Sequence, residues 1–200
     1  MKLFPLLLLS LLSECFKGNQ SANTSVGNIT NVATILPDGK KSIFRFLDSL
    51  HFHSVEVFIF IDKSDHRLYL PQDTLLLKEY AVVFGSNTTD DKLRQGDGCT
   101  PEGIFSIRDQ YPHSKWTKFI WLDYPTADSQ KKQAAAIAAG KIPAGTDIGG
   151  EVGIHGVPAG MDWLIDQKQN WTLGCISLKN NEVNEVYAAV KRESRVIIRK

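Results

Sequence analysis

The chain has 200 residues, of which 42% are hydrophobic and 22% charged, and its formal net charge is +1. A chain of this length and composition can bury enough apolar surface to fold without disulfides or metals. A charge so close to zero argues against a nucleic-acid partner and against binding to an anionic membrane surface.

The first residues predict export. A short positive start precedes residues 3–12, which are almost wholly apolar. This run has about the length of a signal-peptide core and is too short to span a bilayer comfortably. Cys15 closes it and resembles a bacterial lipid-attachment cysteine, although Glu14 stands where a small residue normally precedes that cysteine. We therefore expect residues 1–15 to be a leader, with lipid attachment at Cys15 or a plain cleavage somewhat later as the two alternatives.

A tether and a β-rich domain are expected after the leader. Residues 16–52 begin with a stretch rich in Asn, Ser, Thr and Gly, which predicts a tether, and 39–50 has the spacing of a short helix. Residues 53–200 contain short β-branched and aromatic runs, which predict strands. The expected strands cover 55–61, 67–70, 75–84, 103–108, 118–122, 152–154, 174–178 and 196–198.

Two helices are expected in this domain. Residues 129–139 are good helix formers, with Asp128 near the start and Gly140 at the end. A second helix, capped by Asn180 or Asn181, follows from apolar residues at helical spacing. Many short strands with one or two helices predict an α+β fold that is mostly β, in one domain.

Two segments place a reactive side chain beside glycine at the end of a short apolar strand. His155 precedes Gly156, and Cys175 follows Gly174. A nucleophilic thiol needs a rigid scaffold and backbone amides that can face a developing oxyanion, and His155 is the expected base. Residue types alone do not decide this, because a lone Cys is more often a buried small hydrophobe and a lone His a satisfied loop residue.

Three segments of the sequence form a more specific pattern. Sixteen residues separate His155 from Thr172, and residues 173–176 read Leu-Gly-Cys-Ile. Residues 96–103 read Gly-Asp-Gly-Cys-Thr-Pro-Glu-Gly, and 61–70 form an expected hairpin. Together these segments resemble the L,D-transpeptidase (YkuD-like) family of peptidoglycan enzymes. The family pattern is a His, a spacer, then Ser or Thr, a variable or His position, Gly, Cys and an apolar residue, with a G-D-G-x-T-P-x-G loop and a first hairpin similar to 61–70.

The resemblance implies a YkuD-like bent β-sheet or sandwich that carries Cys175 and His155 at one end. It implies that the Cys175 thiolate attacks the third residue of a stem peptide, usually diaminopimelate, and expels the terminal D-Ala. His155 would take the thiol proton and return it to the leaving amine, while the Gly156 carbonyl orients the imidazole. The amides of Gly174 and Cys175 would hold the oxyanion, and Thr172 would shape that turn. A second amine, from a stem peptide or a wall-anchored protein, would then resolve the thioester.

Two positions depart from the family pattern. Leu173 stands where many members have a second His, and Ser177 where many have an Arg suited to a substrate carboxylate. These departures leave the reaction class intact and the substrate detail open. We expect the 96–103 loop to be structural and Cys99 to be a bystander.

The same residues leave alternatives open. With water as the acceptor the protein would be an L,D-carboxypeptidase or amidase that hydrolyses stem peptides or releases wall-bound protein. A non-catalytic wall-binding module is a further alternative, and a disulfide between Cys99 and Cys175 would disable the nucleophile.

The remaining expectations concern cofactors, partners and location. No metal and no cofactor are expected, because the other histidines lack metal-ligand spacing. The expected partners are peptidoglycan stem peptides and a wall-anchored protein as a candidate acceptor, without nucleic acid. The membrane is expected to be contacted only through the leader or a lipid at Cys15. The expected location is the periplasm or cell envelope.

Overall fold

The computed structural model describes residues 58–71 and 77–200. The expected leader at 1–15, the tether at 16–52 with its helix, and the domain boundary at 53 all lie outside the described residues. They therefore stay predictions.

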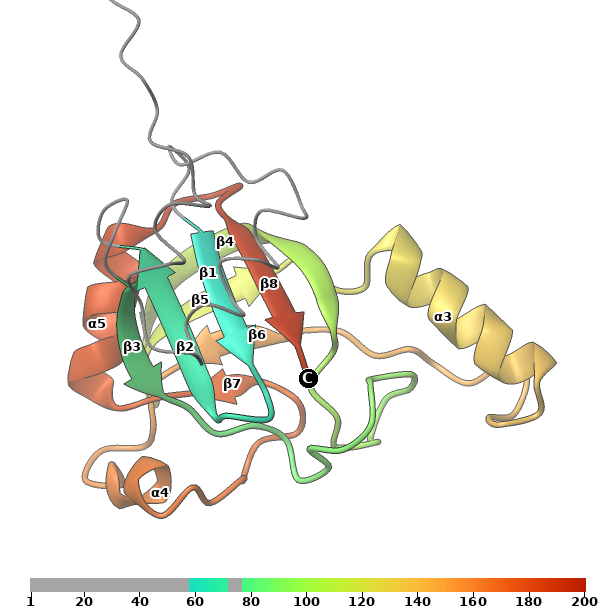
Figure 1. Cartoon of the computed structure of the whole chain (residues 1–200), viewed down its shortest axis with the longest axis horizontal. Helices are drawn as coiled ribbons and strands as arrows, with labels where there is room; N and C mark the ends of the chain where they lie inside the picture. Colours follow the sequence, from blue (N-terminus) through green and yellow to red (C-terminus); the bar gives the residue numbers. More distant parts are fainter. Residues whose placement is uncertain (1–57, 72–76) are drawn as a thin grey trace, which may run out of the picture.

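Eight strands and three helices make up the described part of the chain (Figure 1). The strands are β1 (Phe58–Asp62), β2 (Arg67–Pro71), β3 (Leu77–Ala81), β4 (Gly103–His113), β5 (Thr117–Leu122), β6 (Gly153–His155), β7 (Ile176–Ser177) and β8 (Arg195–Arg199). The helices are α3 (Ala127–Ala138), α4 (Trp163–Asp166) and α5 (Asn180–Ala189). The strands form one sheet in the order β3-β2-β1-β8-β4-β5-β6-β7. The prediction of a mostly β, α+β fold with a bent sheet is confirmed.

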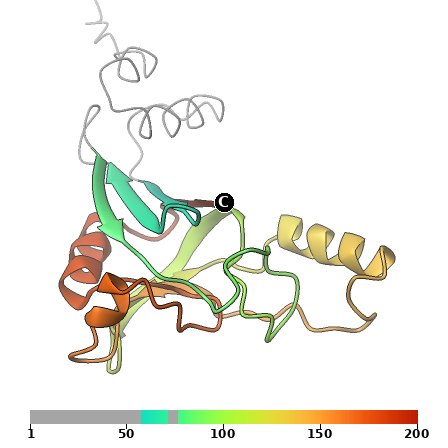
Figure 2. The same ribbon diagram turned by 60° about the horizontal axis from the view of Figure 1, so that its bottom comes forward.

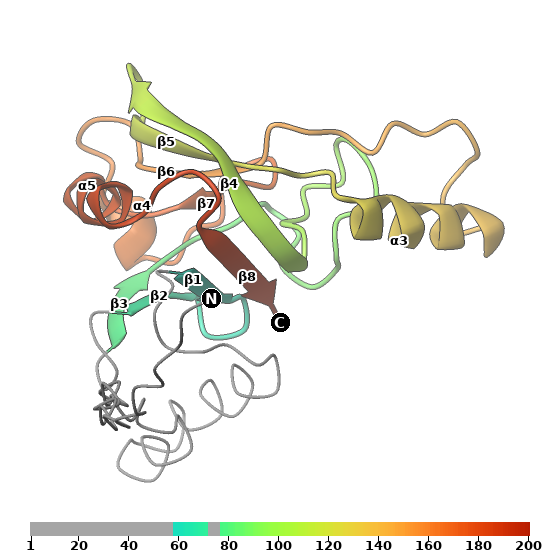
Figure 3. The ribbon, with the colours of Figure 1, turned by 90° about the horizontal axis from the view of Figure 1, so that it is seen from above.

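The long strand β4 joins the two halves of the sheet. Its first residues, Gly103 to Ser106, pair with β8, and the residues from Ile107 onward pair with β5. The register shifts between Ile107 and Asp109, and such a bulge bends and twists a strand. Figure 3 shows β4 crossing from β8 to the β5–β6 side. The bend therefore separates the β1–β2–β3 hairpins from the strands that carry the predicted site.

One apolar core fills the inner side of the bent sheet. Both halves contribute, with Ile59 and Leu68 from the first hairpin and Ile120 and Ile154 from β5 and β6. Helix α5 covers this core with the buried Val183 and other apolar residues. The strands of the site are thus held by a core that spans the whole domain.

Helix α3 stands apart from the sheet (Figure 2) and buries only Ser129 and Ala136. Its polar side chains fasten it to the loop before β4, because Lys132 pairs with Asp91 and Gln133 donates to the carbonyl of Leu93. The long connection from β5 to β6 is therefore tied to that loop. Within the described ranges, no helix has the length and apolar character needed to cross a membrane.

Strand boundaries differ from expectation in three places. β4 extends to His113 instead of Arg108, since the polar residues beyond Ile107 pair with β5. The expected strand 75–84 ends at Ala81 and continues only as an isolated bridge at Val83. The expected strand 174–178 reduces to β7, because the backbone at its start is not extended.

Both long helices were predicted, and in α3 Asp128 lies in the first turn and Gly140 directly follows the C-cap, as expected, whereas the cap expected for α5 was wrong. Thr126 caps α3, and its Oγ1 accepts the backbone N–H of Ser129 at 3.2 Å. Lys179 is the N-cap of α5, in place of Asn180 or Asn181. The four-residue α4 was not predicted, since one helical turn is too short to show periodicity.

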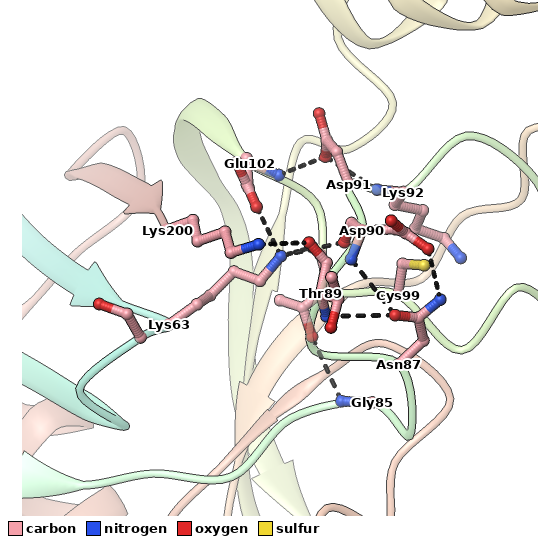
Figure 4. A network of polar contacts seen from close by, with 12 residues as sticks. Lys63, Gly85, Asn87, Thr89, Asp90, Asp91, Lys92, Cys99, Glu102 and Lys200 are labelled. Atoms are coloured by element: carbon pink, nitrogen blue, oxygen red, sulfur yellow. Dashed lines mark hydrogen bonds and ion pairs between the residues drawn. The ribbon is translucent and has the colours of Figure 1, made fainter.

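A buried lysine ties the first hairpin to the loop before β4 (Figure 4). The Lys63 side chain has an exposed fraction of 0%, and its Nζ lies 2.7 Å from Glu102 Oε1. The same ammonium donates to the carbonyls of Asp90 at 3.1 Å and Thr100 at 3.2 Å. All three N–H groups are therefore satisfied, which is the condition for a buried charge to be tolerated.

We expect Lys63→Met to lower the free energy of unfolding by on the order of 2–4 kcal/mol, because it leaves two carbonyls and a carboxylate without their donor. Urea denaturation followed by circular dichroism measures the effect. Lys131→Met is the control, because Lys131 and Asp128 form a pair with exposed side-chain fractions of 79% and 83%. Equal midpoints for the two variants would contradict this role of Lys63.

Candidate active site

A cleft of about 960 Å³ brings Cys175 and His155 to one surface. His155 is the last residue of β6, and Cys175 comes directly before β7, the parallel neighbour of β6. Besides His155, the aromatic residues that line the cleft are Tyr111, His113, Trp116, Phe119, Trp121 and Trp171. The lining also includes Lys92 and residues 149–151. The residues that the sequence singled out for chemistry therefore share an open site.

A backbone carbonyl holds the imidazole of His155. Nδ1 lies 2.7 Å from the oxygen of Gly156, and because a carbonyl only accepts, Nδ1 carries the proton. The hydroxyl of Ser177 donates to the same oxygen at 3.2 Å. Nε2 is then the unprotonated nitrogen, and this tautomer leaves it able to accept a proton.

Aromatic rings enclose the same imidazole. Phe119 is the cross-strand partner of His155, and the two rings stack with centroids 5.9 Å apart. Trp116 stacks on His155 at 4.5 Å, and Trp171 meets it edge-on at 5.6 Å. The ring is thereby fixed in orientation and removed from water.

Burial makes the imidazole a weak base. It lowers the pKa of His155 to about 4; the hydrogen bond to Gly156 acts in the opposite direction, and the nearby charge of His113 adds to the lowering. The charged form is disfavoured because the aromatic surroundings cannot solvate it. His155 is therefore neutral at physiological pH.

The thiol of Cys175 is also neutral at rest. Burial raises its pKa to about 11, a backbone hydrogen bond from Gly153 and the charge of Lys92 lower it, and Glu151 raises it. The Sγ–H donates to the carbonyl of Glu151 at 3.5 Å. Among the described residues, no hydrogen bond joins this sulfur to the imidazole. The site thus holds a neutral thiol and a neutral imidazole at physiological pH.

The turn before Cys175 is built around Thr172. Its Oγ1 donates to the carbonyl of Cys175 at 2.7 Å and accepts the N–H of Gly174 at 3.2 Å. The Gly174 amide, predicted to face an oxyanion, is therefore bonded within the turn. It becomes available to a substrate oxygen only when that oxygen replaces Thr172 Oγ1.

The G-D-G-x-T-P-x-G loop packs directly against this turn. Gly174 has a φ of +138°, and a Cβ there would lie 2.6 Å from the carbonyl oxygen of Cys99. Only glycine permits this approach. Cys99 thus contacts the turn of residues 172–175, which holds the predicted nucleophile and which we call the nucleophile turn, through its backbone.

The thiols of Cys99 and Cys175 are both free. Cys99 is buried, and burial raises the pKa of its thiol to about 11. A disulfide between the two cysteines is therefore absent from the structure, and Cys175 is available as a thiol. In the described part of the chain, no group of His, Cys, Asp or Glu side chains could hold a metal ion.

Several residues around the site were not identified from the sequence. Trp116 and Phe119 stand in an aromatic-rich stretch, but only the pairing of β5 with β6 places them on His155. Lys92 is one lysine among many until the fold places it at the cleft. Leu173 lies at the rim with an exposed fraction of 85%. Cys15, the candidate lipid-attachment residue, lies outside the described residues.

The model of the L,D-transpeptidase catalytic domain (YkuD) matches residues 56–198. The chain belongs to this family. The matched range contains the residues that line the cleft, His155 and Cys175 among them, and the 96–103 loop. The recognition of an L,D-transpeptidase-like domain from its motifs is therefore confirmed, and with it membership of a peptidoglycan-modifying family, whose substrate lies outside the cytoplasm.

Solved structures of similar fold include three bacterial proteins. The helical cell shape determining protein Pgp2 from Campylobacter jejuni is 20% identical, with a TM-score of 0.51 over 72% of this chain and 48% of that chain. Bd1075 from Bdellovibrio bacteriovorus is 18% identical, with a TM-score of 0.49 over 73% and 48%. An L,D-transpeptidase from Mycobacterium smegmatis is 15% identical, with a TM-score of 0.47 over 72% and 59%. The chain spans about half the length of the first two. Among curated proteins, none matches it.

We expect Gly174→Ala to impair the site, because its Cβ would press on the Cys99 carbonyl in a backbone conformation that disfavours alanine. The variant should lose about 1–3 kcal/mol of stability and most of its Cys175 alkylation by iodoacetamide. Gly150→Ala is the matched control, since Gly150 also lines the cleft and its Cβ would meet nothing within 4 Å. Thermal melting measures the stability of the two variants, and mass spectrometry after iodoacetamide treatment measures the alkylation of Cys175. Wild-type labelling of Gly174→Ala would show that the close contact is unimportant.

Proposed function

We propose that the protein is an exported peptidoglycan L,D-transpeptidase that works through an acyl-enzyme on Cys175. The observation that carries this proposal is the pairing, in one cleft, of a free thiol with an imidazole whose Nδ1 is held by Gly156. A base must present an unprotonated nitrogen to the nucleophile, and this arrangement provides one at Nε2. Membership of the family supports peptidoglycan stem peptides as the substrate.

The first half of the reaction forms a thioester. Nε2 of His155 accepts the Cys175 proton while the sulfur attacks the carbonyl carbon of the third stem-peptide residue. The bond between that carbon and the nitrogen of the terminal D-Ala then breaks, and the imidazolium returns its proton to the leaving amine. Hydrogen bonds to the site commonly tighten only when substrate binds, which fits the resting thiol bonded to Glu151.

The second half transfers the acyl group. An amine of another stem peptide, or of a wall-anchored protein, attacks the thioester carbon and loses its proton to His155, and the thiol leaves as the proton returns to sulfur. The Cys175 amide is the first candidate for the oxyanion donor, and Gly174 joins it if the substrate oxygen replaces Thr172. Water in place of the amine would give a carboxypeptidase or amidase with the same two residues.

The proposal includes export, with residues 1–15 as the leader and Cys15 as a candidate lipid attachment. Both lie outside the described residues and rest on the sequence. Intact mass of the mature protein, isolated from its producing cell, decides between lipid attachment at Cys15 and a cleavage that leaves no lipid.

Covalent trapping tests the nucleophile. We expect one carbapenem molecule to add to the wild-type protein at Cys175 and none to add to Cys175→Ala, as measured by intact-mass and peptide-mapping spectrometry. Cys99→Ala is the matched control and should react like wild type, because Cys99 is buried with a raised pKa. A protein that forms no adduct, and whose effect on cells survives Cys175→Ala, would instead be the non-catalytic wall-binding module. With isolated peptidoglycan, new cross-linked dimers indicate transfer and shortened monomers indicate hydrolysis.

The pH dependence of kcat/KM tests whether His155 and Cys175 are both neutral in the resting enzyme. Activity needs His155 unprotonated, and its pKa of about 4 means that acid should reduce kcat/KM only near that pH, instead of near 6.5 as for an ordinary histidine. The raised pKa of Cys175, about 11, keeps the proton available for the leaving amine through neutral and mildly alkaline pH. Steady-state kcat/KM on a stem tetrapeptide should therefore be flat between about pH 5.5 and 9. A half-maximal rate between about pH 6 and 7 would contradict this assignment.

A further inference from the structure

Lys92, in the loop before β4, differs from Lys63, the buried lysine of the first hairpin, in how many of its N–H groups have an acceptor. Lys63 has an acceptor for each of its three N–H groups. Lys92 donates to Asp97 Oδ1 at 2.9 Å and to the carbonyl of Arg94 at 3.1 Å. In the described part of the chain, its third N–H has no acceptor. Figure 4 shows the Lys92 side chain running to the opposite side of the loop from the Lys63 ammonium.

The Lys92 ammonium lies beside the nucleophile turn. Its side chain has an exposed fraction of only 4%, yet it borders the cleft. A Cβ built on Gly174 would lie 3.7 Å from its Nζ. The charge also acts on the reactive sulfur, since Lys92 lowers the pKa of Cys175 more than Glu151 raises it. The cation is therefore close enough to affect groups that react at Cys175.

Lys92 is the one lysine or arginine in the described lining of the cleft. Asp147 and Glu151 also line it, and they carry the opposite charge. Ser177, next to the site, is fully buried, and its hydroxyl is directed to the Gly156 carbonyl. A substrate carboxylate near Cys175 therefore has Lys92 as its available cationic partner.

We propose that Lys92 binds the terminal carboxylate of the donor peptide, on the residue that leaves. This inference rests on the proposed function. The scissile carbonyl carbon must lie at the Cys175 sulfur, and in a leaving α-amino acid the carboxylate carbon is three bonds further along. An ammonium beside Gly174 is within that short reach, and it can donate its free N–H to one carboxylate oxygen. The carboxylate stays ionised throughout and departs with the leaving amino acid.

Asp97 prepares the cation for this role. Its two oxygens accept the N–H groups of Leu93, Arg94 and Cys99 as well as the Lys92 ammonium. The carboxylate is thereby fixed in place and holds Lys92 against the loop. Little side-chain entropy remains to be lost when a ligand binds, so the third N–H is presented in advance.

The test compares two donor peptides that differ at one group. A stem tetrapeptide with a free C-terminal carboxylate and the same peptide with a C-terminal carboxamide are assayed for release of the terminal residue. We expect wild type to prefer the carboxylate by roughly tenfold or more in kcat/KM, as for a hydrogen bond to a charged group. Lys92→Met should reduce this preference to about twofold or less, mainly by slowing the carboxylate peptide. Lys132→Met, which removes an ion-paired lysine outside the cleft, should keep it.

The outcomes separate the inference from the proposed function. Turnover of both peptides by wild type at equal kcat/KM overturns the role of Lys92 and leaves the function standing. An equal loss on both peptides in Lys92→Met makes Lys92 a positioning residue and also overturns the inference. Should that variant fail to fold, the double variant Lys92→Met with Asp97→Asn, which removes both charges of the pair, replaces it in the assay. The wild-type ratio of kcat/KM for the two peptides still shows by itself whether the site favours the terminal carboxylate. No turnover of either peptide by wild type overturns the proposed function and the inference with it.

Discussion

The hydrogen bond from His155 Nδ1 to the Gly156 carbonyl determines what the rest of the site can do. It fixes the tautomer, and only this tautomer leaves Nε2 free to accept a proton. The carbonyl is itself immobilised, since Gly156 donates its N–H to the Trp116 carbonyl at 3.0 Å and accepts from Ser177. A side chain at Gly156 would overlap Asn180 Oδ1, so this geometry requires glycine. The imidazole is thus oriented by backbone, and no carboxylate of the described residues is hydrogen-bonded to it.

That arrangement has an electrostatic consequence. A carboxylate would stabilise an imidazolium, whereas a neutral carbonyl and aromatic rings do not compensate for lost solvation. The fall in the pKa of His155 from 6.5 to about 4 corresponds to on the order of 3 kcal/mol against protonation. Burial likewise disfavours the charged form of Cys175, because it raises the pKa of the thiol. The ion pair of a Cys175 thiolate and a His155 imidazolium is consequently disfavoured at rest. It becomes accessible when the two charges stabilise each other or when a substrate group stabilises one of them.

The sequence was sufficient to predict the fold class and to single out His155 and Cys175, which the structure brings into one cleft, because both signals are encoded locally. Strand propensity and the glycine-flanked His155 and Cys175 can be read from short segments. The aromatic enclosure could not be read in this way, since Phe119 meets His155 only through the pairing of β5 with β6. The hydrogen bond from the Gly174 amide to the Thr172 hydroxyl could not be predicted either, because it depends on the direction of the Thr172 side chain. The α5 cap was misassigned because Lys179, a residue with no capping preference, precedes two asparagines that are good caps.

The loop before β4 explains how a small domain keeps its nucleophile turn in place. The turn has no disulfide and no metal among the described residues, and Gly174 is in a conformation that few residues adopt. Its support comes from backbone contact with Cys99, and that part of the loop is in turn fixed by the two buried lysines. Lys63 is fully satisfied and so can only be structural. Among the described residues, Lys92 retains an unused donor where the loop borders the cleft together with Gln95 and Gly96, so the loop that supports the turn also places a cation in the lining of the cleft.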